Sequence, residues 1–174
     1  MNRIGIFSGT FDPIHPGHIS FAVEAMKDCN LDKVVFLPET SPREKENVTD
    51  ISIRVEALQK AIGNNKNLEV MQIDDEQFTI GETLPKLKDI FNNSSLTLLI
   101  GSDIVKTLTY RWKGIDKLFI DLSLAIGMRV GDDEESISAI IKEVEIITKN
   151  KINYNFIYTD HMHLASSQIR RTDI

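Results

Sequence analysis

The sequence predicts an α/β fold in which helices cover both faces of one parallel β-sheet. Short apolar runs alternate along the chain with segments of helical period, which is the order that builds such a sheet. Several runs are unbroken, as is typical of strands buried on both faces. The 174 residues are 41% hydrophobic and 26% charged, close to the average of globular domains, and no linker divides them. We therefore expect a single domain spanning residues 1–174.

The apolar runs mark the strands in order along the chain. Each run has the length of a strand and is bounded by turn-forming or helical segments. The expected strands are Arg3–Phe7, Lys33–Leu37, Leu68–Ile73, Leu96–Ile100, Leu122–Gly127 and Asn155–Tyr158. In an open sheet of this kind, ligands bind in a crevice at the carboxyl ends of the strands.

Amphipathic stripes mark helices between these strands. Apolar residues recur at spacings of three and four, so that they share one face of a helix. The stripes are Ile19, Ala22, Val23 and Met26, then Ile51, Val55, Leu58 and Ile62, then Ile137, Ile140, Ile141, Val144 and Ile147. All three stripes are expected to pack against the core. The polar segments Pro38–Asp50 and Gly127–Glu135 are expected to be loops that are either mobile or face the substrate.

Charge and cysteine content exclude several classes of protein. The formal charge is −6 and no basic run is present, so long nucleic acid is not an expected partner. Cys29 is the only cysteine, which excludes an internal disulfide. The N-terminal apolar stretch is too short for a signal peptide, and nothing approaches the roughly 20 apolar residues that a membrane span requires. We expect a cytoplasmic protein with no membrane partner.

The loop after the first strand has the properties of a phosphate site. Gly9 allows close backbone approach, and Pro16 stands where a first helical residue is well tolerated. The N-terminus of the following helix favours an anion. His15 and His18 are three residues apart, so their rings share one helix face and can donate hydrogen bonds to phosphate oxygens. This geometry favours stabilisation of charge on a phosphoryl group.

Two other interpretations of the histidines remain open. One histidine would cap the helix while the other packs as a satisfied polar side chain. Alternatively, both would bind a metal, but neither a cysteine nor another histidine lies nearby to complete a zinc set, so we expect no metal ligands here.

The whole string carries a family resemblance. The phosphate loop of the nucleotidyltransferase superfamily, which includes the class I aminoacyl-tRNA synthetases, is similar to Gly9-Thr10-Phe11-Asp12-Pro13-Ile14-His15-Pro16-Gly17-His18. The resemblance implies a Rossmann-like fold, with histidines that bind the ATP phosphates and stabilise the pentacoordinate α-phosphate without a covalent intermediate. It places Gly9, Thr10, Phe11 and Gly17 in the ATP site and makes His15 and His18 catalytic.

Further motifs resemble nicotinate mononucleotide adenylyltransferases. Gly101-Ser102-Asp103 matches a Gly-x-Asp segment of that family, which places Gly101 and Asp103 in the ATP site. A carboxylate at the carboxyl end of a strand can accept hydrogen bonds from ribose hydroxyls. The alternative is that Ser102 or Asp103 caps the next helix. Trp112 matches a tryptophan that packs on the pyridine ring of the mononucleotide. The alternative is a tryptophan of the core.

Three weaker matches complete the acceptor side. Thr83-Leu84 stands in place of a family Thr-Leu, which implies that Thr83 offers hydroxyl and backbone groups to the nicotinate carboxylate. Arg129 heads Arg-Val-Gly where the family has Arg-Pro-Gly. In the loop Pro38–Asp50, Arg43 and Lys45 resemble a family Pro-His-Lys, and either cation can neutralise a phosphate. Solvated loop charges are the alternative.

A second phosphate motif lies near the end of the chain. Ala165-Ser166-Ser167-Gln168-Ile169-Arg170 resembles the family's Ser-Ser-Thr-x-Ile-Arg. The resemblance implies that Ser166 and Ser167 hold the triphosphate and that Arg170 neutralises its β- and γ-phosphates. An ordinary serine cap followed by a surface arginine is the alternative.

Taken together, the motifs imply adenylyl transfer from ATP to nicotinate mononucleotide, giving deamido-NAD and pyrophosphate. Mg²⁺ is expected to arrive with ATP rather than in a protein cage. One alternative is the same chemistry on nicotinamide mononucleotide or phosphopantetheine, or a CTP-dependent transfer. The other alternative is a nucleotide-binding module without catalytic activity, because the sequence departs from the family motifs at Arg43, Ala165 and Ser167. The sequence leaves the existence of a homo-oligomer open.

Overall fold

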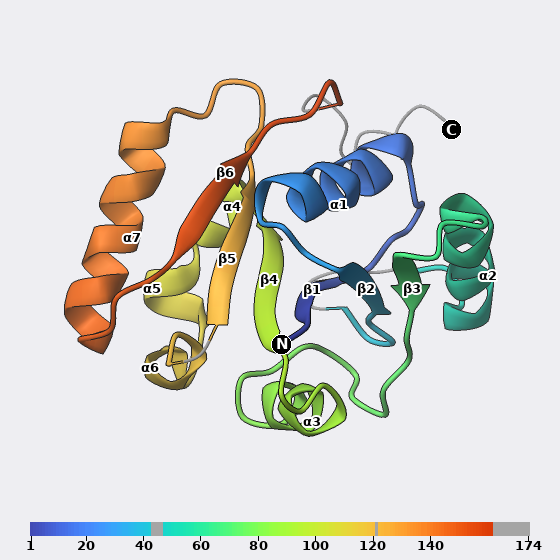
Figure 1. The fold of residues 1–174 in the computed structure, drawn as a ribbon, viewed down its shortest axis with the longest axis horizontal. Helices are drawn as coiled ribbons and strands as arrows, with labels where there is room; N and C mark the ends of the chain where they lie inside the picture. The colour runs from blue at the N-terminus through green and yellow to red at the C-terminus, as the bar shows by residue number, and fades with distance from the viewer. Residues whose placement is uncertain (43–46, 121, 162–174) are drawn as a thin grey trace.

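A computed structural model describes residues 1–42, 47–120 and 122–161. Its centre is a six-stranded sheet with the order β3-β2-β1-β4-β5-β6, in which every neighbouring pair is parallel (Figure 1). The strands are β1 Arg3–Gly9, β2 Lys33–Pro38, β3 Leu68–Val70, β4 Ser95–Gly101, β5 Leu122–Gly127 and β6 Tyr154–Ile157. The α/β fold predicted from the alternation of apolar runs and helical stripes is confirmed.

Helices follow or connect the strands, as parallel pairing requires crossover connections. They are α1 Pro16–Asp28, α2 Ile51–Ile62, α3 Thr83–Ile90, α4 Ser102–Val105, α5 Leu108–Arg111, α6 Ile115–Leu118 and α7 Glu134–Thr148. The N-termini of α2 and α7 are capped by the side chains of Asp50 and Asp133, which accept from Ser52 N–H and Ser136 N–H. These caps fix where the two helices begin.

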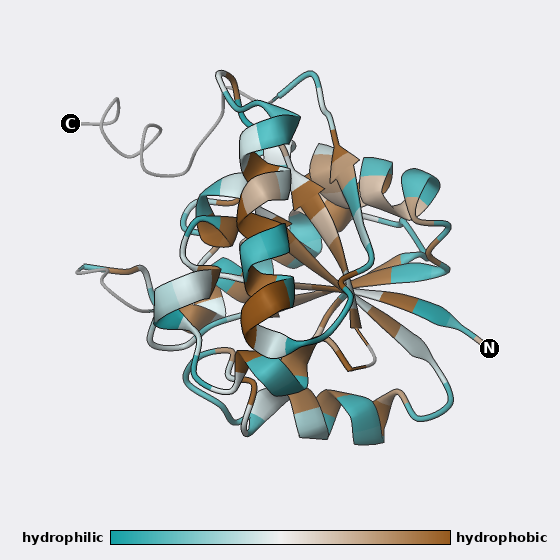
Figure 2. Cartoon of the chain, turned by 90° about the vertical axis from the view of Figure 1, so that its left-hand side faces the viewer, coloured by the Kyte–Doolittle hydropathy of each residue, from teal (hydrophilic) through white to brown (hydrophobic). Residues whose placement is uncertain are grey.

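Two apolar clusters cover opposite faces of the sheet. One joins the strands to α1 and α2 through side chains such as Phe21, Phe36 and Leu58. The other joins them to the remaining helices through side chains such as Leu87 and Ile141. The central strands carry mostly hydrophobic residues, whereas the helices carry both hydrophobic and hydrophilic residues (Figure 2). Burial on both faces explains why the strands read as continuous apolar runs.

The parallel register aligns the ends of the strands that matter for ligand binding. Gly9 at the end of β1 pairs with Pro38, and Gly101 at the end of β4 pairs with Gly127. The chain runs outward from β1 to β3 in one direction and from β4 to β6 in the other, so β1 and β4 flank the topological switch point. A crevice for ligands lies outside the carboxyl ends of such a pair.

Several strand bounds shift by one or two residues from the sequence-based expectation, and two details differ more clearly. Strand β3 ends at Val70 instead of Ile73, because the edge strand pairs only over Leu68 to Val70. On α7 the buried positions are Ile137, Ile141, Val144 and Thr148, whereas Ile147 is exposed. The last turn buries the threonine because its hydroxyl donates to the carbonyl of Val144 at 2.8 Å and so satisfies its polar atom.

No helix in the described parts of the chain is long and apolar enough to cross a membrane.

Candidate active site

The two histidines of the first loop lie against each other at the start of α1. Their ring centroids are 3.8 Å apart, with 34° between the ring planes. The main-chain N–H of His15 donates to Nδ1 of His18 at 3.3 Å. In the neutral state, His18 therefore carries its proton on Nε2, which makes Nε2 a donor for an anion. His15 is the N-cap residue of α1 and Pro16 is the first helical residue, so the anion-attracting helix end lies beside both rings.

Aromatic side chains beneath the loop hold His18 in place. The Phe11 ring lies 5.3 Å from the His18 ring and the Phe7 ring 6.0 Å from it, centroid to centroid. Phe11 is buried and has a φ of 49°, a left-handed conformation that turns the loop sharply. A side chain at Gly9 would come within 3.3 Å of the Phe11 ring, so glycine is needed for this close approach. Phe11 thus supports His18 through its ring, while a contact of its backbone with ATP stays a prediction.

His15 is kept neutral by its surroundings. Burial lowers the pKa of His15 below the ordinary value of 6.5, and electrostatic repulsion by Arg129 and His161 lowers it further. Its Nδ1 is buried without a hydrogen-bond partner among the described residues. The N-cap position and an unpaired buried ring nitrogen therefore fall on the same residue. Leaving a buried polar atom without a hydrogen-bond partner costs free energy, and a ligand that supplies the partner removes this cost.

His161 is a residue of this site that sequence reasoning did not place. A side chain at Gly17 would meet the His15 ring at 3.0 Å and Cβ of His161 at 3.5 Å, so the chain after β6 returns to the phosphate loop. The expectation that no further histidine lies near His15 and His18 was therefore wrong, because the fold joins segments far apart in sequence. No group of three His, Cys, Asp or Glu side chains in the described residues is arranged to hold a metal ion.

At the end of β4, Asp103 pairs with Arg129 from the loop after β5. Nε and Nη2 of Arg129 donate to Oδ1 of Asp103 at 3.2 and 3.1 Å. A side chain at Gly101 would collide with this carboxylate, so the glycine makes room for the pair. The alternative that Ser102 or Asp103 caps the next helix was wrong, because Gly101 is the N-cap residue of α4 and no side chain bonds there.

Asp132 fixes the segment that carries Arg129. Its carboxylate accepts hydrogen bonds from the hydroxyl of Ser102, from Lys106 Nζ at 2.8 Å and from the main-chain N–H of Arg129 at 2.8 Å. Burial opposes ionisation, yet these three donors hold the pKa of Asp132 below its ordinary value. The loops after β4 and β5 are thereby joined at the crevice.

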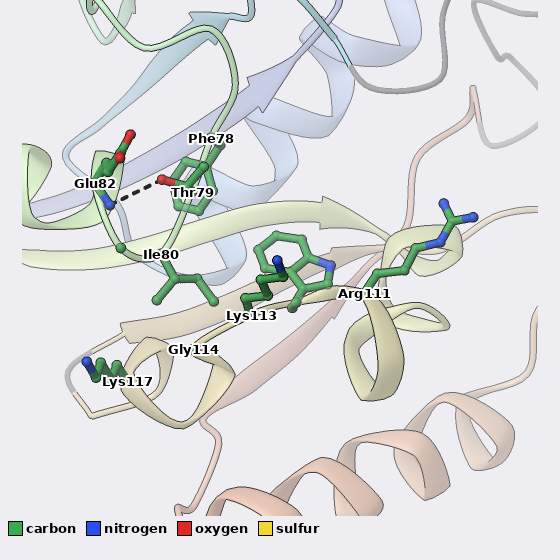
Figure 3. A pocket seen from close by; sticks show the side chains of 10 residues that line it. Phe78, Thr79, Ile80, Glu82, Arg111, Lys113, Gly114 and Lys117 are labelled. Atoms are coloured by element: carbon green, nitrogen blue, oxygen red, sulfur yellow. Dashed lines mark hydrogen bonds between the residues drawn. The ribbon is translucent and has the colours of Figure 1, made fainter.

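A pocket of about 750 Å³ opens beside Trp112. One wall is the segment before α3, and the other runs from the end of α5 into α6 (Figure 3). The Trp112 ring lies 6.2 Å from the Phe78 ring, and its Nε1 donates to the hydroxyl of Thr107 at 3.3 Å. Trp112 is half-buried, packs against the core and also lines the pocket, while its stacking on a pyridine ring stays a prediction. The pocket lining is Phe78, Thr79, Ile80, Gly81, Glu82, Arg111, Trp112, Lys113, Gly114 and Lys117.

Thr83 lies behind the pocket wall. It is the first residue of α3 and is fully buried. Its hydroxyl donates to the carbonyl of Gln77 at 3.2 Å and accepts the Thr79 N–H at 2.9 Å. The hydroxyl of Thr79 accepts from Glu82 N–H at 3.1 Å (Figure 3). Thr83 therefore shapes the segment that lines the pocket, while its neighbours face the space.

The remaining predicted site residues lie outside the described residues. These are Arg43 and Lys45 in the loop after β2, and Ser166, Ser167 and Arg170 of the second phosphate motif.

Comparisons with known proteins place the chain in a family. The sequence profile described as cytidylyltransferase-like matches residues 6–172. A probable nicotinate-nucleotide adenylyltransferase of Clostridium perfringens (strain SM101 / Type A) is 35% identical over 181 residues, covering 98% of this chain and 85% of that protein. The nicotinate-nucleotide adenylyltransferase of Bacillus subtilis (strain 168) is 37% identical over 135 residues, covering 74% of this chain and 70% of that protein.

Solved structures agree on the fold. The nicotinic acid mononucleotide adenylyltransferase of Plasmodium falciparum complexed with NaAD superposes with a TM-score of 0.77, at 17% identity, over 98% of this chain and 83% of that chain. The same Plasmodium enzyme complexed with APC gives a TM-score of 0.76. The chain accordingly belongs to the cytidylyltransferase-like family and, within it, to the nicotinate-nucleotide adenylyltransferases.

Proposed function

We propose that the crevice between β1 and β4 transfers the adenylyl group of ATP to nicotinate mononucleotide, giving deamido-NAD and pyrophosphate. The observation that carries the proposal is the pair of adjacent imidazoles at the N-terminus of α1, with ring centroids 3.8 Å apart and at the topological switch point of the sheet. Family membership supports the choice of reaction.

The ATP half of the site is built around the phosphate loop. His15 and His18 face the triphosphate, and the backbone at Gly9, Thr10, Phe11 and Gly17 lets it approach. Mg²⁺ enters as part of the substrate, bound to the phosphates of ATP. The exposed carboxylate of Asp103 is available to the ribose once Arg129, now paired with it, turns toward a phosphate. Ser166, Ser167 and Arg170 supply the second phosphate contact on the strength of their motif alone.

The pyridine half is the pocket beside Trp112. Its volume of about 750 Å³ falls within the range of small-molecule sites, and a flat indole offers a surface on which a pyridine ring can stack. Its lining carries three cations, Arg111, Lys113 and Lys117, against the single carboxylate of Glu82. That balance favours the negatively charged nicotinate over the neutral nicotinamide. The cations are exposed, so solvent weakens the preference that each contributes.

The chemistry is an in-line displacement at phosphorus. An oxygen of the mononucleotide 5′-phosphate forms a bond to the α-phosphorus of ATP, and the bond from that phosphorus to the bridging oxygen breaks. The bonding electrons leave with pyrophosphate, which departs with Mg²⁺. The nucleophile is already ionised, so no general base is needed. His15, His18, Arg129 and Arg170 offset the charge that builds up on the phosphoryl oxygens.

Turnover assays on the full chain test the proposal. ATP is paired with nicotinate mononucleotide, nicotinamide mononucleotide or phosphopantetheine, CTP replaces ATP in a parallel series, and pyrophosphate release is measured. We expect turnover with ATP and the nicotinate acceptor. His18→Ala should reduce kcat on the order of 10²-fold, because a donor to the transition state is lost. Lys27→Ala, exposed on the same helix, is the control.

Each alternative has its own signature in these assays. Activity only with a non-pyridine acceptor would refute the choice of substrate. ATP binding without pyrophosphate release from any pair would instead identify a catalytically silent module. Near wild-type turnover in His18→Ala would remove His18 from the catalytic group.

A further inference from the structure

A buried arginine on α2 contacts three separate backbone segments around the crevice. Arg54 is 2% exposed. Its Nη1 donates to the carbonyl of Thr10 at 2.7 Å, its Nη2 to Glu39 at 2.9 Å and its Nε to Thr49 at 2.7 Å. Burying a guanidinium costs solvation free energy, and main-chain carbonyls compensate for it only in a well-fitted arrangement. All three guanidinium nitrogens are used in this way.

The bond to Thr10 sets the orientation of a peptide in the phosphate loop. The peptide between Thr10 and Phe11 is trans, so its C=O and N–H point in opposite directions. Because the C=O points at Arg54, the N–H of Phe11 points away from α2. Helix α2 contacts β2 and β3, on one side of β1, whereas β4 lies on the other side. The Phe11 N–H therefore faces away from Arg54, in the loop whose main-chain N–H groups can donate to an anion.

The hydrogen bond to Glu39 connects Arg54 to the pocket beside Trp112. The main-chain N–H of Glu39 donates to the carbonyl of Gly9 at 3.0 Å. Its carboxylate accepts from the Phe78 N–H at 3.1 Å and from the Ser8 hydroxyl at 3.2 Å. Phe78 lines the pocket beside Trp112. A continuous set of hydrogen bonds thus joins the phosphate loop, Arg54, Glu39 and the pocket wall.

We infer that Arg54 is a positioning residue for adenylyl transfer. Its guanidinium fixes the position of the phosphate loop relative to the wall of the pocket beside Trp112. The inference rests on the proposed function. Arg54 touches no reacting atom in it. Its effect arises because the two substrates bind on the two elements that it joins, and a displacement of about 1 Å between reacting groups can cost roughly 100-fold in rate.

Arg54→Lys in the full chain tests the inference. Lysine keeps the charge, but its single nitrogen cannot reach three carbonyls in the geometry of a planar fork. We expect kcat to fall about 10- to 100-fold, while KM for ATP changes less than about 5-fold, because alignment is lost rather than ground-state binding. Arg3→Lys, an exposed arginine on β1, is the matched control and should leave both constants unchanged. Assays are run well below the lower of the two melting temperatures.

Chemical rescue separates positioning from folding. Arg54→Ala leaves space for guanidinium, which is added at concentrations too low to denature. We expect guanidinium to restore part of kcat, and ammonium or urea to restore none. Ammonium lacks the planar fork of donors, and urea, although planar, lacks the positive charge and the third nitrogen that the three carbonyls require. Recovery of the folded state without recovery of kcat would overturn the inference, as would Arg54→Lys with kcat within threefold of wild type.

The amide resonance of Phe11 provides a test that needs no turnover. In the wild-type protein, adding MgATP should shift this resonance, and the shift should be markedly smaller in Arg54→Lys. Equal shifts in the two proteins would contradict the assigned role. If wild-type protein fails to use nicotinate mononucleotide, the proposed function fails, whereas the Phe11 measurement still reports on Arg54. The two failures are therefore distinguishable.

Discussion

His15 combines a buried ring with two neighbours, Arg129 and His161, that oppose its protonation, and this combination makes it sensitive to pH. Burial first, and then Arg129 and His161, lower its pKa below 6.5 in the folded protein. The unfolded chain keeps the ordinary value. Between the two values the unfolded state binds a proton that the folded state does not. The folded state is therefore destabilised as pH falls through 6.5, and the loss levels off below the folded pKa.

A comparison of unfolding at several pH values tests this account. Urea midpoints of the wild type and of His15→Gln are measured from about pH 8 to about pH 5, a range that brackets an ordinary histidine pKa. We expect the wild type to lose more stability than the variant as pH falls, since the glutamine does not titrate. Parallel profiles would show that His15 is not held neutral by burial.

Other residues show why chemistry and position must be considered together. Arg54 occupies the buried side of α2 with Leu58, four residues later, although its charge suggests a solvated position. A charged residue at apolar spacing was the available signal, since it follows Ile51 by three and precedes Leu58 by four. The sequence could have identified it as unusual, but its three carbonyl partners come from distant segments.

At the scale of elements, side chains from β2, β4 and the segment before β2 pack closely against β1, and this packing sets the position of the loop that follows β1. Gly5 lies in the middle of β1. A Cβ there would lie 2.9 Å from side-chain atoms of Leu31, Val34 and Leu99 at once. These contacts are shorter than packed atoms adopt, and they come from three different residues. The glycine therefore lets β1 and its covering side chains approach closely.

Gly5→Ala should destabilise the fold by about 1–3 kcal/mol, the usual cost of overpacking a core. Denaturant unfolding measures the change, and the slope should stay constant. Gly81→Ala is the matched control, because a Cβ at Gly81 has nothing within 4 Å. A stability loss equal to that of the control would mean that the neighbouring side chains move aside at no cost.

At the scale of the whole molecule, three strand ends converge on one electrostatic site. Arg129 follows β5, its partner Asp103 follows β4, and His15, whose pKa it lowers, follows β1. Asp132 secures the arginine segment through Ser102 and Lys106. The order of the sheet places these ends side by side, which lets one cation act on both the carboxylate and the imidazole.

Arg129→Met should therefore raise the pKa of His15 toward its ordinary value, because a positive charge that opposes protonation is removed. The titration of the His15 ring by NMR measures this shift. Arg3→Met removes an arginine exposed on β1, and should leave the His15 titration unchanged. An unchanged pKa in Arg129→Met would place the arginine too far from the imidazole in solution to act on it.

By itself, the sequence determined the fold class and the strand, turn and helix start that form the loop from Gly9 to His18. Alternating apolar runs and helical stripes are local patterns, and so is the string from Gly9 to His18, because chain neighbours make the strand, the turn and the helix start. The switch-point position of Gly9 and Gly101 followed from strand order only once the sheet was known.

Only the tertiary structure decided which distant residues act together. It brought His161 to Gly17 and paired Arg129 with Asp103, 26 positions apart. It also turned the hydroxyl of Thr83 inward and joined Arg54 to Thr10, 44 positions away. The physical reason is that crossover connections pack segments that share no local pattern. Their contacts depend on the register of the sheet and on which buried polar atoms find partners, and neither is encoded in residue spacing.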